Sequence, residues 1–147
     1  MTDTTVVAKR VGQLRATALA SIVILLIEFA IGSNLYNQAP KSAQGQSTFA
    51  AFGLAIVDGP IALAIHAILG TLIIAGAIQA LVRAIQSHSV AFIVLGAIAL
   101  LAIVLAWFGG STYVSTHSAV ASHVMGLGTG VAILCYAVVL FIVPKRP

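Results

Sequence analysis

The chain has 147 residues, of which 61% are hydrophobic and 7% are charged, and its mean hydropathy is +1.13. Soluble domains carry about 25% charged residues, so the composition excludes a water-soluble fold and indicates one integral membrane domain in a lipid bilayer. The net charge of +4 predicts no nucleic-acid partner, because the basic residues flank apolar runs instead of sharing one polar face.

Four apolar runs are long enough to cross a bilayer, which takes about 20 apolar residues in a helix. They lie at 16–36, 60–82, 90–108 and 119–143. The segments 83–89 and 109–118 are predicted to be short polar turns, and 37–59 forms a longer outer loop. Short turns make successive helices neighbours. The predicted fold is therefore an all-α, antiparallel four-helix membrane bundle.

The distribution of basic residues predicts the orientation, because lysine and arginine mark the cytoplasmic side. Lys41 is the only basic residue in the outer loop. The other six lie before the first run, in the turn 83–89 or at the end of the chain: Lys9, Arg10, Arg15, Arg83, Lys145 and Arg146. We expect a multi-pass cell-membrane protein with both termini in the cytoplasm. The first run is too long for a typical signal peptide and is interpreted as a retained anchor, the alternative being cleavage after Ala39 or Ala43.

The outer loop contains a second apolar stretch, 49–57, that is too short to span. It is either a short interfacial helix that covers the outer end of the bundle or an early start of the next helix, kinked at Pro60. Trp107, Phe108 and Tyr113 gather at the outer end of the third run, as is typical of an aromatic belt.

Two histidines, His66 and His123, lie in the second and fourth runs, each about one and a half to two turns from the outer side. Histidine is rare in spanning helices because its polar ring needs a partner there. Gly70 and Gly126 follow them on the same helix faces and leave room for a flat ligand, although small residues at this spacing also serve helix packing. The pair predicts bis-histidine ligation of haem b. The alternatives are paired structural or proton-handling histidines, or another metal.

Haem A synthases are the family that this pattern resembles. His66 in the string HAILG and His123 in SHVMGLG correspond to the histidines on the second and fourth helices of one four-helix half of such an enzyme. The resemblance implies a haem near the outer side. The family's acidic residue and arginine around the first histidine are absent, Ala67 stands after His66, and the outer loop has no cysteine pair. The implied function is therefore electron transfer or haem handling, with a membrane redox partner or a second copy, and whether the protein is an enzyme stays open.

Glu28 is the only acidic residue deep inside a predicted spanning helix. A charged group there costs about 2.5–3.5 kcal/mol on insertion scales, so such residues are usually paired or functional. With haem present, it could contact a ligand imidazole or relay a proton. Without haem, it resembles the first-helix glutamate of small multidrug transporters and would indicate a proton-coupled small-molecule transporter. A packing role, with Ser21 and Asn34 as partners in a non-catalytic accessory subunit, is the third alternative.

Overall fold

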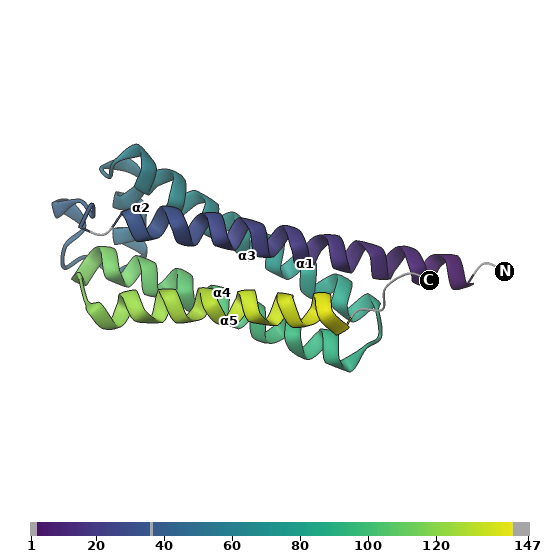
Figure 1. Ribbon diagram of the computed structural model, residues 1–147. Coiled ribbons are helices and arrows are strands. Elements are labelled where there is room, and N and C mark those ends of the chain that lie inside the picture. Colours follow the sequence, from purple (N-terminus) through teal and green to yellow (C-terminus); the bar gives the residue numbers. More distant parts are fainter. Residues whose placement is uncertain (1–2, 36, 143–147) are drawn as a thin grey trace.

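The computed structural model describes residues 3–35 and 37–142. Tyr36 and 143–147, which include the predicted end of the last helix with Lys145 and Arg146, lie outside the described residues. The elements are α1 (Asp3–Asn34), a short 3-10 helix η1 (Lys41–Ala43), α2 (Thr48–Val57), α3 (Ile61–Gln86), α4 (Val90–Thr116) and α5 (Ala119–Ile142) (Figure 1). The described residues contain no strand, so the predicted all-α class is confirmed.

Four of these helices, α1, α3, α4 and α5, are long and apolar enough to cross a membrane. Large apolar side chains point away from the bundle: Phe141 is 92% exposed, Leu134 63% and Leu101 61%. Exposing such apolar side chains to water costs free energy, whereas contact with lipid acyl chains does not. The helices therefore have the surface of a membrane-spanning protein, as the composition predicted.

The four long helices form a ring. α1 packs against α3 and α5, and α4 packs against the same two helices, so α3 and α5 occupy diagonally opposite corners. The turn 87–89 lies at the same end of the bundle as the start of α1 and the end of α5 (Figure 1). The loop after α1, η1 and α2 lie at the other end, which is called the α2 end below.

The helix α4 is longer than the sequence predicted. It continues past Phe108 to Thr116, so the predicted polar turn 109–118 is wrong except for its last two residues. The Thr116 hydroxyl in this polar segment donates to the Thr112 carbonyl, so its hydrogen bond is made within the helix. A side chain at Gly109 would place its Cβ 2.9 Å from the Ala121 carbonyl oxygen, so the glycine lets α4 and α5 approach closely.

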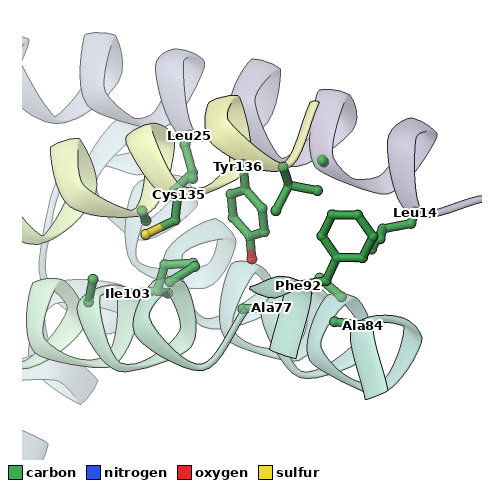
Figure 2. Close-up of a cluster of buried hydrophobic side chains, with 14 residues drawn as sticks. Leu14, Leu25, Ala77, Ala84, Phe92, Ile103, Cys135 and Tyr136 are labelled. Atoms are coloured by element: carbon green, nitrogen blue, oxygen red, sulfur yellow. The ribbon is translucent and has the colours of Figure 1, made fainter. Parts of the chain in front are cut away.

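A small-residue core fills the end opposite to α2. Leu14 of α1, Phe92 of α4 and Tyr136 of α5 surround it, together with alanines of α3 such as Ala77 and Ala84 (Figure 2). The Tyr136 ring projects from α5 toward the space between α3 and α4 in Figure 2. Alanines let the helix backbones come close and one aromatic ring fills the remaining space, so this half of the bundle is closed.

The helix α2 is a separate short helix, which decides between the two alternatives for the outer loop. Ser47 caps its start by accepting from the Ala50 N–H, and it packs on α3 and α4. A sharp turn at Gly59 then leads into α3, and a Cβ at Gly59 would overlap the Ala55 carbonyl oxygen. Ala51 and Ala55 of α2 are buried against the rest of the bundle, so the helix covers this end as a lid.

Candidate functional site

A cavity of about 500 Å³ lies between the helices at the α2 end. Small-molecule sites in proteins have about 300–1,000 Å³ and mostly apolar walls with a few polar groups. This cavity has both properties, because most of its lining side chains are aliphatic or aromatic. Its polar lining residues come from α1, α3, α4 and α5: Glu28, Ser33, His66, Ser111, Ser122, His123 and Thr129.

Glu28 and His66 form the central polar contact of the cavity. The Nδ1 atom of His66 lies 2.5 Å from Oε2 of Glu28, and the contact joins α3 to α1. Glu28 is only 5% exposed. The sequence left a histidine, Ser21 and Asn34 open as partners of this glutamate, and in the structure the contact is with His66. The Asn34 amide donates instead to the Ala30 carbonyl.

Glu28 and His66 each have one polar atom that their mutual contact does not occupy. Oε1 of Glu28 is buried and has no hydrogen-bond partner among the described residues. Buried oxygens are normally hydrogen-bonded, so an orphan at a cavity wall marks a place for a donor, either a proton or a ligand group. With Nδ1 committed to Glu28, Nε2 is the ring nitrogen of His66 that is left for a ligand.

Gly32 holds the His66 ring in place from α1. A Cβ at this position would lie 2.8 Å from Cε1 and 3.1 Å from Nε2 of His66, so only glycine leaves room for the ring. No role for Gly32 was predicted from the sequence. Its position one turn after Glu28 on the same helix is the signal that could have indicated it.

His123 lines the same cavity from α5, the helix diagonally opposite to α3. The structure therefore brings the two predicted histidines to one site. Gly126 lies beside His123 and has nothing within 4 Å of where a Cβ would be, so it leaves cavity space and makes no helix contact. Gly70 has a different environment, because its Cβ would lie 3.8 Å from Oε1 of Glu28.

The other two histidines do not line the cavity. His88 is in the turn between α3 and α4, and His117 follows the end of α4, where its ring lies 5.7 Å from the ring of Tyr113. Asp58 accepts a hydrogen bond from the Ser42 hydroxyl. No group of three or more His, Cys, Asp or Glu that could hold a metal ion is found in the part of the chain that the structure describes.

The aromatic residues at the end of α4 form a wall of the cavity, which goes beyond the predicted belt. The Trp107 and Phe52 rings have centroids 4.9 Å apart, and both residues line the cavity. The Trp107 indole N–H donates to the Thr71 hydroxyl of α3, and Phe49 packs on the same indole at 5.9 Å. Trp107 thus joins α4 to α3 and to the α2 lid.

Comparisons of the chain with protein-family models, with curated protein sequences and with solved structures each found no match.

Proposed function

We propose that the cavity binds haem b, whose iron His66 and His123 would hold, and that the protein acts in electron transfer or haem handling. One observation carries the proposal: two imidazoles on diagonally opposite helices line a single cavity of ligand size. A porphyrin supplies four of the iron ligands itself, so two protein nitrogens are sufficient and no larger cluster of ligating residues is needed.

The residues of the chain have separate tasks in this proposal. Glu28 accepts from the Nδ1–H of His66, which fixes the tautomer so that the Nε2 lone pair is free for a metal. Gly32 seats the ring, and Gly126 leaves the space beside His123 empty. When bound, haem would supply reversible one-electron chemistry at its iron.

The proposal includes the placement in the membrane. We infer an antiparallel bundle in the cell membrane, with both termini on the cytoplasmic side and α2 on the outer side. Arg15 and Arg83 support this orientation, because they belong to the parts of α1 and α3 away from the α2 end, whereas Lys41 belongs to η1. Arg83 also donates to the Thr17 hydroxyl and so ties α3 to α1.

Absorption spectra test the haem site. The protein is purified in mild detergent after expression with a haem precursor, and oxidised and dithionite-reduced spectra are recorded. We expect a sharp Soret band and split visible bands on reduction, which His66→Ala and His123→Ala each abolish. His88→Asn is the matched control, since asparagine tolerates the positive φ of 55° at that position. A hemin titration in which the protein gives neither the sharp Soret band nor the split visible bands would overturn the proposal.

Proton-coupled transport of a small molecule is the second candidate, favoured by the unpartnered Oε1 of Glu28 at the cavity wall. A carboxyl that shares a proton with His66 can exchange that proton for a donor group of a substrate. In proteoliposomes, transport driven by a pH gradient should then disappear in Glu28→Gln and persist in His88→Asn. Equal transport by wild type and Glu28→Gln would exclude this candidate.

A further inference from the structure

We propose that the cavity receives its ligand sideways from the lipid, through the seam between α1 and α5 at the α2 end. The seam is defined by Phe29 and Ser33 on α1 and by His123 and Leu127 on α5. This proposal rests on the proposed function, because it takes the cavity as a ligand site. It adds where the ligand enters and what kind of ligand it is: a lipid-soluble molecule with a polar group that reaches Glu28.

The exposure of the cavity walls points to this seam. Among all residues that line the cavity, the exposed ones are these four, and each lies on α1 or α5. Phe29 is 53% exposed and Leu127 is 71% exposed, although both border the cavity. The lining residues on α2, α3 and α4 are all partly or fully buried. One side of the cavity therefore faces the surroundings of the bundle.

The route from the outer end is covered by α2. Phe52 on its inner face lines the cavity and packs on Trp107, and Ala55 is only 2% exposed. The loop before α2 is also tied to α4: the Ser115 hydroxyl donates to the Gln46 carbonyl, and the Gly45 N–H donates to the Ser115 carbonyl. A ligand coming from the aqueous side would have to displace this lid.

The route from the opposite end is closed by the packed core around Tyr136. In that half, α1 and α5 share one cluster of buried side chains, including Leu14 and Leu25 of α1 and Cys135 of α5 (Figure 2). Toward the α2 end, α5 instead presents Gly126, where a Cβ would meet nothing within 4 Å. The same two helices thus share buried side chains in one half, whereas in the other half their cavity-lining residues include exposed ones. In a bilayer, this exposed side of the cavity would lie against acyl chains, so lipid-soluble molecules are the ones that would reach it.

Two variants of α5 test the seam. Gly126 and Gly130 are one turn apart, and at both a Cβ would meet nothing within 4 Å, but only Gly126 lines the cavity. Gly126→Leu should narrow the seam, and Gly130→Leu is the matched control. Ser33→Leu narrows the seam from α1 and takes over the test if Gly126→Leu does not fold.

The first readout is independent of haem. Trp107 is the only tryptophan of the chain and lines the cavity. In vesicles of phospholipid with brominated acyl chains, bromine that enters through the seam quenches its fluorescence. We expect at least twofold less quenching in Gly126→Leu and unchanged quenching in Gly130→Leu. The second readout is the rate of hemin uptake from hemin-loaded vesicles, which should fall at least tenfold in Gly126→Leu and stay unchanged in Gly130→Leu.

The two readouts separate the seam from the haem site. If wild type never binds hemin but Gly126→Leu reduces the quenching, the haem proposal fails and the seam stands. If hemin is bound and Gly126→Leu changes neither the quenching nor the uptake rate, the seam is refuted. Equal losses in Gly126→Leu and Gly130→Leu would also overturn it, because the effect would then not depend on the cavity wall.

Discussion

Replacement of Gly32 by alanine tests the geometry of the candidate site most directly. The added Cβ would lie 2.8 Å from Cε1 of His66, whereas carbon atoms pack best at about 3.5–4.0 Å. The ring must therefore move by about 0.7 Å or more. Its Nδ1 now lies 2.5 Å from Oε2 of Glu28, and an N–H···O bond becomes weak beyond about 3.2 Å. A shift of at least this size, directed away from Glu28, lengthens the contact to about 3.2 Å or more, where the hydrogen bond is largely lost.

The expected magnitude follows from the bond that is lost. A hydrogen bond to a charged group contributes about 1.5–3 kcal/mol to stability, and alanine returns about 1 kcal/mol of helix propensity relative to glycine. Gly32→Ala should therefore lower the stability of the bundle by about 0.5–2 kcal/mol. Loss of an outer hydrogen bond to a metal-ligating histidine lowers metal affinity by about 10–100-fold, and we expect the same for hemin.

The measurements are a hemin titration followed by absorbance and thermal unfolding in the same detergent. Gly130→Ala is the control, because it makes the same chemical change on a helix where a Cβ meets nothing. It should match wild type in hemin affinity and be equally or slightly more stable. If Gly32→Ala behaves like Gly130→Ala in both measurements, the His66 ring is not held between Gly32 and Glu28, and the reasoning is wrong.

Three further changes address the pair, the lid and the helix packing. Glu28→Gln replaces the carboxylate behind the ligand imidazole by a neutral amide, so a redox titration should show a haem reduction potential that is higher by tens of millivolts. A shift of about 59 mV is a tenfold change in a one-electron equilibrium. An unchanged potential would argue against the contact between Glu28 and His66. Phe52→Ala removes the ring that covers Trp107, so tryptophan emission should shift to the red and protease should cut the outer loop faster, whereas wild-type behaviour in both assays would mean that α2 is held by other contacts. Gly128→Val puts a Cβ 2.5 Å from a backbone oxygen of α4 and should lower the apparent Tm by several degrees through overpacking, while Gly130→Val should not; equal Tm values would contradict the close packing of α4 on α5.

The sequence predicted the membrane class and the four long helices because these depend on local composition. Runs of about 20 apolar residues must form helices in lipid, where every backbone group needs an internal partner. The ends of the helices were less certain. Gly109 and the serines and threonines after it are typical of a turn, but in this chain Thr116 bonds within its own helix and Gly109 packs against α5. A glycine that breaks a helix and one that admits a neighbouring helix look the same in a sequence.

The candidate site, too, could be predicted from the sequence only in part. Its chemical groups were evident in the sequence, because a glutamate and two histidines are costly inside apolar helices and therefore stand out. Their pairing was not, since Glu28 had two histidines within reach on different helices, and only the packing of α1 on α3 brings His66 to it. Gly32, Phe52 and Trp107 carry no such signal, because glycine and aromatic residues are common in any membrane bundle.

The sequence by itself thus determined that the chain is a helical membrane protein with ionisable groups at its core. The composition and the hydrophobic periodicity of a segment are properties of that segment alone, so they can be obtained without knowing which other segments pack against it. The tertiary structure decided that Glu28 pairs with His66, that α2 covers one end of the bundle and that the exposed residues lining the cavity lie on α1 and α5. These features depend on which helix faces which, and that choice is made by contacts between residues far apart in the chain.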